Sequence, residues 1–517
     1  MNIHNASRRQ FLRHASALSA TVGSVAAPLA LNLAALGSAS AQASSDYKAI
    51  VCIFLFGGND SINMVLPTDG ASWANYTAVR NQAPESIALL PPGTAVNTGA
   101  PAGSPARLGG VLPINPLNAQ GRSFALHPAM AALQALFDTE RRLAILPSTG
   151  PLVMPTSKAQ YGQASHPKPA SLFSHNDQQN TWQSFRPEGA TQGWGGRMGD
   201  LFAAQNARPV FTAISTSGNS VWLAGETVKQ YQVGTNGAIR MGSDGNGRIY
   251  GSAEVARALE RIVGGSRGTH LFEADLATVS QRALDAELTL RSALKPASDP
   301  LFGTPPASGG YSANSDPKLQ YDNPLTGTRS ANNLAQQLQV VARMIDASSG
   351  ASIGARRQVF FVSLGGFDTH DNQNRAHADL MARLAHGMQY FDAALGAMGA
   401  RHAVTTFTAS DFGRTFTSNG DGTDHGWGAH HFVMGGAVRG GDLYGSFPVL
   451  GAKNANNNNF DSSPNQLGNG SLLPENSVDQ LGATLGRWFG LSDSQLLDVF
   501  PNLRNFDASR RNLGFMV

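Results

Sequence analysis

Three continuous apolar runs, each followed by a glycine- or serine-containing turn, constrain the fold more than any other feature of the chain. They are Ala49–Phe56, Gln358–Leu364 and Ala403–Thr408, and shorter runs lie at Leu143–Leu146 and Pro209–Ile214. A run that is apolar on both faces is typical of a central strand in a parallel sheet. Segments with helical periodicity lie between the runs, at Pro128–Phe137, Ala253–Ile262, Leu276–Leu294, Asn332–Ile345, Ala376–Met398 and Val478–Phe489. This alternation predicts an α/β fold, with a mostly parallel central sheet flanked by helices on both faces.

The length and composition favour one large domain. A chain of 517 residues with 41% hydrophobic and 14% charged residues is neither disordered nor a coiled coil. We expect residues 44–517 to form a single domain, with a helical cap insertion at about 225–330 and surface excursions at 91–121, 296–328 and 453–470. The single cysteine, Cys52, excludes a disulfide framework and a cysteine-based zinc cluster.

The N-terminal segment resembles a twin-arginine export signal. Arg8 and Arg9 precede Phe11-Leu12, and Ala15–Ala43 holds no charged residue and ends in small residues. We therefore predict that residues 1–43 are a signal peptide recognised by the twin-arginine export machinery. The mature protein is then expected to be periplasmic or secreted, without a stable membrane anchor after cleavage.

The net charge gives no sign of a nucleic-acid partner. Lys and Arg total 38 against 35 Asp and Glu, a net charge of +3. Residues 1–43 contain three arginines and no acid, so they account for all of it. The remaining chain is close to neutral and has no dense basic run, so we expect no binding to nucleic acid.

Acidic and histidine side chains collect directly after the three main apolar runs. Because the carboxyl ends of parallel strands meet at one edge of a sheet, these side chains are expected to lie together. The expected set is Asp60, Asp368, His370, Asp411, Asp424, His425 and one of the neighbours His430 and His431. Carboxylates with imidazoles and no thiolate suit Zn²⁺ or Mn²⁺, and clustered carboxylates without a cation would repel one another. The pattern predicts a site for one or two divalent ions. For any single residue of the set, the alternative is a structural role as a helix cap or a turn residue.

The segment from Leu172 to Trp182 is unusually polar and admits two interpretations. Ser174 is either a helix N-cap, with Asp177 completing a variant capping box, or a nucleophile at the start of a helix. A second serine motif, the G-x-S-x-G pattern of Gly264–Gly268, follows a helical pattern where a serine esterase needs a strand, so we interpret it as a chance match.

Several motifs together resemble the bacterial exported family known as domain of unknown function 1501. They are SRRQFL, LFGGNDSINMVLP, LFSHNDQQNTWQ, SLGGFDTHDNQ, SDFGRT, GTDHGWGAHHFVMGG and SVDQLGATLGRWFGL. The resemblance extends from about residue 48 to residue 503. The family is thought to be a distant branch of the alkaline phosphatase and sulfatase superfamily. The resemblance therefore implies a site of two metals at the carboxyl edge of the sheet, and hydrolysis or transfer of phosphate or sulfate esters.

Carried over position by position, the resemblance makes Asp60, Asp368, His370, Asp411 and either His425 or His430 metal ligands, and Ser174 the nucleophile. The chain departs from the superfamily in two ways. The gap from Asp368 to His370 is two residues where four are usual, and Asp411 is followed by Phe412 where a histidine is usual. These departures concern a ligand of the second metal, and therefore the two-metal site as a whole.

The function expected from the sequence is that of an exported metal-dependent hydrolase, acting on a small-molecule or polymeric ester. Arg414 or Asn59 would hold the oxygens of the ester, because arginine offers two parallel donors to phosphate or sulfate. Arg414 has an alternative role in an ion pair with an aspartate of the same edge. Two other functions stay open: an exported binding or assembly protein that has lost catalysis, and a metal-free serine hydrolase that uses Ser174 and His175.

Overall fold

The computed structural model describes residues 47–235, 237–238, 248–264, 270–350 and 352–517. The expected signal peptide, residues 1–43, lies outside the described residues, and so does most of the Gly264–Gly268 motif. Lys48–Val517 forms a compact unit. Within the part of the chain that the structure describes, no helix combines the length and apolar character needed to cross a membrane.

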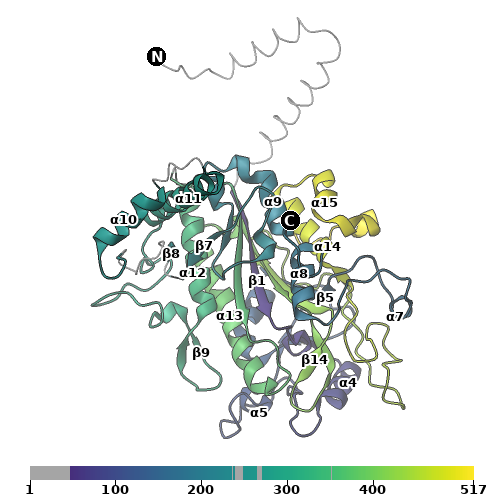
Figure 1. Ribbon diagram of the computed structural model, residues 1–517. Helices are drawn as coiled ribbons and strands as arrows, with labels where there is room; N and C mark the ends of the chain where they lie inside the picture. Colours follow the sequence, from purple (N-terminus) through teal and green to yellow (C-terminus); the bar gives the residue numbers. More distant parts are fainter. Residues whose placement is uncertain (1–46, 236, 239–247, 265–269, 351) are drawn as a thin grey trace, which may run out of the picture. The chain divides into compact units, whose positions relative to one another are not determined.

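A nine-stranded sheet runs through this unit in the order β16-β5-β15-β12-β1-β11-β6-β7-β8 (Figure 1). Its strands are β1 Lys48–Phe56, β5 Leu143–Gly150, β6 Ala213–Ser215, β7 Tyr231–Gly234, β8 Gly237–Ala238, β11 Arg357–Gly365, β12 Val404–Ser410, β15 Ala429–Gly435 and β16 Asn476–Ser477. The central strand β1 pairs in parallel with β11 and β12, and β11 pairs in parallel with β6. Only β15 and β8 pair antiparallel to their described neighbours. The predicted mostly parallel α/β fold is confirmed.

Helices cover both faces of the sheet. They are α3 Ser61–Met64, α4 Gly70–Arg80, α5 Pro105–Leu108, α6 Ala131–Asp138, α7 Lys158–Tyr161, α8 His175–Ser184, α9 Trp194–Phe202, α10 Ala253–Gly264, α11 Leu271–Ala293, α12 Asn333–Ser348, α13 Gln373–Ala397, α14 Val478–Phe489 and α15 Asp493–Val499. Alternate residues of β1, such as Cys52 and Phe54, pack into one apolar core with α8, α9, α14 and α15. The intervening residues of β1 are equally buried, and α12 packs on β11 with α13 beside it. Because both faces are covered, the central strands are apolar throughout.

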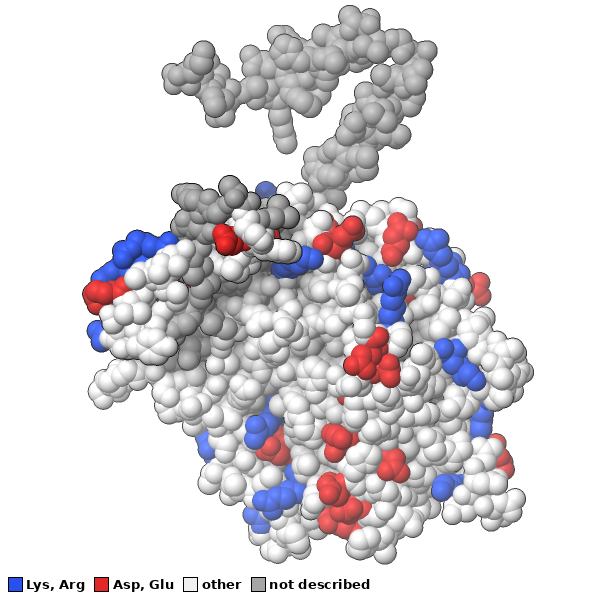
Figure 2. Space-filling view, in the orientation of Figure 1, with Lys and Arg blue, Asp and Glu red and all other residues white. Residues whose placement is uncertain are grey.

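Three small sheets complete the unit. Their strands are β2 Val65–Pro67, β3 Leu112–Ile114 and β4 Phe124–Leu126 in one, β9 Gln320–Asp322 and β10 Arg329–Ala331 in the second, and β13 Arg414–Ser418 and β14 Thr423–His425 in the third. The region at 225–330 adds β7 and β8 to the edge of the main sheet and carries the helices α10 and α11. On the face shown in Figure 2, basic and acidic residues are interspersed in small groups.

The apolar runs and periodic segments of the sequence correspond to elements of the structure, with one partial exception. The segment Pro209–Ile214 begins as the 3-10 turn Pro209–Phe211, and only its end belongs to β6. The strand β15 lies outside the expected apolar runs, because its sequence AHHFVMG combines two histidines with apolar residues. Both histidines are fully buried in it.

Candidate metal centre

The carboxyl ends of β1, β11 and β12 meet at one edge of the sheet, because the parallel registers bring their last residues side by side. The loop after β11 carries Asp368, and the loop after β12 begins with Asp411. The hairpin strand β14 ends with His425, and α8 begins with His175. Segments separated by about half of the chain therefore supply side chains to this edge.

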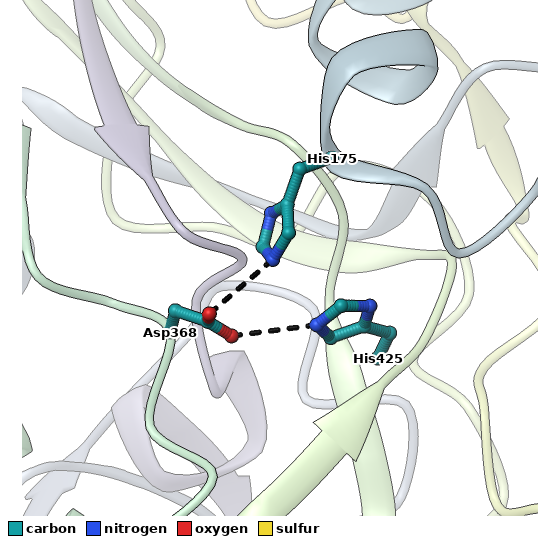
Figure 3. Close-up of side chains that lie close together, drawn as sticks. All are labelled: His175, Asp368 and His425. Atoms are coloured by element: carbon teal, nitrogen blue, oxygen red, sulfur yellow. Dashed lines mark ion pairs between the residues drawn. The ribbon is translucent and has the colours of Figure 1, made fainter.

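His175, Asp368 and His425 direct ligand atoms toward a common point (Figure 3). The carboxylate of Asp368 lies 3.4 Å from Nε2 of His175 and 3.4 Å from Nε2 of His425. One ligand atom from each residue lies within 4.8 Å of the other two. Two imidazoles and one carboxylate are a common ligand set of catalytic zinc, which leaves a coordination position open.

The ring of His175 is held in place by Asp411. Nδ1 of His175 lies 2.7 Å from Oδ2 of Asp411, and the same oxygen accepts from Gln179 Nε2 at 2.8 Å and from the backbone N–H of Gly57 at 3.2 Å. The hydrogen bond to Asp411 raises the pKa of His175 against the opposing effect of burial. Since a carboxylate only accepts, Nδ1 carries the proton. Nε2 then faces Asp368, and it makes no hydrogen bond with any described residue.

His425 is oriented by a backbone carbonyl. Its Nδ1 donates to the carbonyl oxygen of Phe173 at 2.7 Å, which leaves Nε2 as the acceptor on the side of Asp368 and His370. Burial lowers the pKa of His425, so the ring is held neutral. Phe173 has a φ of +74°, in the left-handed region that aromatic residues rarely adopt. This strained residue lies directly before the N-cap residue of α8, and its carbonyl fixes one histidine of the cluster.

Asp368 is kept ionised by Arg414. Nη1 of Arg414 donates to Oδ1 of Asp368 at 2.9 Å and to the carbonyl of Gly57 at 2.9 Å, and its Nε donates to Thr423 O at 3.0 Å. Burial would raise the pKa of Asp368, but the hydrogen bond and charge of Arg414 lower it. Of the two roles considered for Arg414, the ion pair with an aspartate of the same edge is present.

His370 and Asp424 adjoin the cluster on its exposed side. Nε2 of His370 lies 3.1 Å from Oδ1 of Asp368 and 2.9 Å from Nε2 of His425. Nδ1 of His370 lies 3.3 Å from Oδ1 of Asp424. On the opposite, buried side, the ring of Phe412 packs against the rings of His175 and His425 at centroid distances of 4.9 Å and 4.7 Å. His370 is thus placed to contribute a further nitrogen, whereas Phe412 contributes an apolar wall.

Asp60 lies near this edge, but its carboxylate is paired with Arg80. Both of its oxygens accept from Arg80, at 2.5 Å and 2.9 Å, and Gln373 Nε2 donates to it at 2.6 Å. Burial would raise the pKa of Asp60, but the charge of Arg80 lowers it. The Asp60 carboxylate therefore forms a fully buried salt bridge, and it lies outside the group of His175, Asp368 and His425.

The other expected site residues also lie outside this group. Asn59 is buried, with Oδ1 3.1 Å from Nε2 of His377 and Nδ2 3.3 Å from the sulfur of Met64. His430 is buried on β15, where its Nδ1 accepts from the N–H of Ser148 at 3.0 Å, and burial lowers its pKa to about 3.

Ser174 is the N-cap residue of α8, directly before His175. Its side chain does not cap the helix backbone. The pKa of Asp177 is lowered by the backbone N–H of Glu188 and by the Ser174 hydroxyl. The capping box considered from the sequence is thus not formed, while the hydroxyl and Asp177 do interact.

Sequence reasoning did not include His175 among the metal ligands. The available signal was its position: it directly follows a serine at the start of a polar helix, in the segment Leu172–Trp182 already singled out. The pairing of His175 with Asp411 joins segments 236 positions apart, which no local pattern reveals.

The similarity to known proteins is limited. A family model described as "Protein of unknown function (DUF1501)" matches residues 324–500, which include Asp368, His370, Asp411 and His425. This supports the resemblance over part of the range expected from the motifs. No curated protein sequence matches the chain.

Two solved structures illustrate the structural similarity. One, described as Ps i-CgsB in complex with k-i-k-neocarrahexaose, has a TM-score of 0.33 at 8% identity, covering 91% of this chain and 78% of that chain. The other, labelled BT33494S-sulf and linked to glycosaminoglycan metabolism by Bacteroides thetaiotaomicron, has a TM-score of 0.31 at 10% identity, covering 87% of this chain and 74% of that chain. Similarity at this level is too low to define a shared fold, so the α/β architecture stands on the strand pairing itself.

Proposed function

We propose that this chain is an exported hydrolase of phosphate or sulfate esters that uses one divalent ion, Zn²⁺ or Mn²⁺, held by His175, Asp368 and His425. The observation that carries the proposal is the convergence of these three residues, with the buried Nε2 of His175 free of any hydrogen bond among the described residues. A divalent ion at this point would supply Lewis-acid stabilisation of the charge that develops on an ester oxygen.

The side chains around the three ligands have the features of a metal site. Metal-binding histidines usually donate their second ring N–H to a carboxylate or a carbonyl, which fixes the tautomer and orientation. His175 donates in this way to Asp411, and His425 donates to the carbonyl of Phe173. Both rings therefore turn Nε2 to the side of Asp368, where a bound ion would take the place of any proton on that nitrogen. His370 is the proposed fourth donor, because its Nε2 is close to both Asp368 and His425.

The contacts favour one ion over two. A second ion needs further ligands, and the superfamily that the sequence resembles usually has a histidine at the position of Phe412. Here the Phe412 ring is buried against His175 and His425. Asp60, the other expected ligand, is neutralised by Arg80. We therefore assign a single ion to the site.

Ser174 is the proposed nucleophile. It precedes His175 at the N-terminus of α8, where the positive end of the helix dipole stabilises negative charge on an oxygen. Its hydroxyl oxygen would form a bond to the phosphorus or sulfur of the ester as the bond to the alcohol oxygen breaks, and the serine proton would leave with the alcohol. Water would then cleave the bond to Ser174, which releases phosphate or sulfate and restores the hydroxyl. Arg414 would act indirectly, because its guanidinium already donates to Asp368, Gly57 and Thr423 and so holds the ligand Asp368 in place.

The proposal is tested by metal content and turnover measured on the same preparations. The chain is stripped with a chelator, reloaded with Zn²⁺ or Mn²⁺ and analysed for bound metal, and turnover is assayed with p-nitrophenyl phosphate and p-nitrophenyl sulfate. We expect roughly one ion per chain, lost in His175→Ala and in Asp368→Ala. The control is His402→Ala, since His402 is exposed and lies before β12, at the opposite edge of the sheet. Equal metal content in His175→Ala and the control would contradict the metal site.

A second candidate function is an exported binding protein without catalysis. The engagement of Arg414 within the protein favours it, because all three nitrogens of the guanidinium donate to Asp368, Gly57 or Thr423. Ser174→Ala separates the two candidates. In a hydrolase this variant loses turnover and keeps its metal, whereas in a binding protein neither the wild type nor the variant turns over either ester while both bind the ion.

A further inference from the structure

The helices α10 and α11 expose large apolar side chains outside the metal centre. On α11, Phe272 is 77% exposed, Leu276 66% and Val279 52%, and on α10 Ile262 is 71% exposed. Single exposed apolar residues are common on protein surfaces, but a contiguous group marks an interaction site. On α11 the three residues follow the spacing i, i+4, i+7, so they lie on one face of the helix.

This exposed face continues a buried one. The residues Phe272, Leu276, Val279, Ala283, Ala286 and Leu290 form one apolar stripe along α11, with an average spacing near 3.6. At its C-terminal end Ala286 and Leu290 are buried, and α11 contacts β8 at the edge of the main sheet. The N-terminal half of the stripe, from Phe272 to Ala283, extends beyond this support. We call this half the α11 stripe.

The neighbouring helix does not cover the α11 stripe. Arg257, Glu260 and Arg261 of α10 line a cavity of about 470 Å³ together with Gln281, Leu284, Glu287 and Leu288 of α11. These α11 residues lie mainly on a different face of the helix from the stripe, because residues at 281, 284 and 288 are rotated well away from those at 272, 276 and 279. The charged side of α10 thus faces α11, and the stripe stays exposed.

The charges beside the α11 stripe match a second copy of the same helix. Asp275 and Arg282 are seven residues apart and therefore lie on the same flank of the stripe. An antiparallel pairing of two α11 helices, centred between Ala277 and Thr278, sets Phe272 of one copy opposite Ala283 of the other, and Leu276 opposite Val279. The same pairing brings Asp275 of each copy within one helical turn of Arg282 of the other, on the same side of the contact.

The same charges disfavour a membrane as the occupant. Helices that lie on anionic membranes carry Lys and Arg along the border of the apolar face. The α11 stripe is bordered by Glu273 and Asp275 at its N-terminal end, with Arg282 as the one basic residue of this segment.

We propose that the α11 stripe is a self-association surface, through which two copies of this chain pair antiparallel about a two-fold axis. A surface that is complementary to itself is what a two-fold dimer requires. The contact is small, at the lower end of specific interfaces, which bury about 1,200 Å² in total. The dimer is therefore expected to have a micromolar dissociation constant.

The test is sedimentation velocity of the whole chain over a concentration range of about 1 to 100 µM. The wild type is expected to shift from monomer to dimer within this range. Phe272→Lys and Leu276→Lys are each expected to raise the dissociation constant by about 30-fold or more, since both large apolar side chains face the partner helix in this pairing. The matched control is Thr278→Lys, an exposed residue on another face of α11, which is expected to leave the dissociation constant within about threefold. Wild-type protein that stays monomeric throughout overturns the proposal.

Charge reversal tests the arrangement independently of apolar burial. Asp275→Arg and Arg282→Asp each place like charges across the contact and are expected to weaken the dimer about tenfold, while the double variant restores it. Additive weakening in the double variant overturns the antiparallel pairing. Co-sedimentation with vesicles of phosphatidylcholine and phosphatidylglycerol is measured in parallel. If the wild type is monomeric and binds vesicles, and Leu276→Lys abolishes this binding, the α11 stripe is assigned to a membrane and self-association is overturned.

Discussion

Nδ1 of His175 lies 2.7 Å from Oδ2 of Asp411, although the two residues are 236 positions apart in the chain. Asp411 is fully buried and directly follows β12, and His175 is the first residue of α8. The same Asp411 oxygen also accepts from Gln179 and from the backbone of Gly57. This pair is what turns Nε2 of His175 toward Asp368, and the proposed site depends on it.

Asp411→Asn is expected to lower metal affinity about 10- to 100-fold, because a carboxylate that accepts from a histidine ligand orients the ring and increases its basicity. The measurement is competition with a chromogenic chelator. The control is Asp498→Asn, since Asp498 is exposed and pairs with Arg504 rather than with a residue of the metal centre. We expect the control to change affinity by less than about threefold. Equal losses in the two variants would show that Asp411 has no special role.

Gly57→Ala is expected to damage the same site. Gly57 has a φ of +115°, and a Cβ atom there would lie 2.3 Å from the backbone nitrogen of Asp368. The loop after β1 must then shift, and both Asp368 and the N–H that supports Asp411 shift with it. We expect a loss of about 3 kcal/mol or more in the free energy of unfolding, measured by urea denaturation, together with weaker metal binding.

Gly93→Ala is the matched control for the variant at Gly57. Gly93 also has a positive φ, of +81°, but nothing lies within 4 Å of a Cβ placed there. Only the backbone strain of about 1–2 kcal/mol is then expected. Similar losses in the two variants would show that the close approach to Asp368 is unimportant.

Arg80→Leu is expected to destabilise the fold by about 3–5 kcal/mol, because it leaves Asp60 charged and unpaired in the interior. Arg80 and Asp60 are both fully buried. The comparison is Arg504→Ala, which breaks a pair with Asp498 in which both side chains are more than half exposed. That change should lower the free energy of unfolding, measured by urea denaturation, by less than about 1 kcal/mol. A small effect at Arg80 would mean that the Asp60 carboxylate has another partner.

The stability should decrease as the pH rises through the titration of Asp479. Burial raises the pKa of Asp479 to about 7, against the opposing hydrogen bonds from Asn502. Since the folded-state pKa is above that of the unfolded chain, the native state binds the extra proton between about pH 4 and 7, and this stabilisation is lost as the pH rises through 7. The loss is at most about 4 kcal/mol, since each tenfold change in proton affinity corresponds to about 1.4 kcal/mol.

Asp479→Asn isolates this effect, because the amide keeps an oxygen that accepts from Asn502 and carries no charge. Denaturation at pH 5 and pH 8 should show a smaller decrease in stability for the variant than for the wild type. An identical decrease in both would assign the pH dependence to other groups.

The central strands and several helices could be predicted from the sequence, because their signals are local. The runs at β1, β11 and β12 are apolar on both faces, and α14 begins and ends where its periodicity does, at Val478 and Phe489. The segment of β15 is not a continuous apolar run, because two histidines interrupt it, although both are buried in the strand. Their neutral, buried state depends on the residues that surround them, which lie elsewhere in the chain.

The site could be predicted only in part for the same reason. Asp368 and His425 follow strand ends and were expected to meet, and they do lie within 3.4 Å. The sequence offers no sign that Arg80 would neutralise Asp60, because the pair forms through the packing of α4 beside the β13–β14 hairpin. The role of His175 likewise depends on the placement of α8 over the end of β12.

Anomalous diffraction at the zinc or manganese absorption edge, from crystals of the metal-loaded chain, tests the central claim most directly. The account predicts one strong peak, about 2.0–2.2 Å from Nε2 of His175, Nε2 of His425 and a carboxylate oxygen of Asp368. A peak at Asp60 or elsewhere, or no peak at these three residues in metal-loaded crystals, would contradict it.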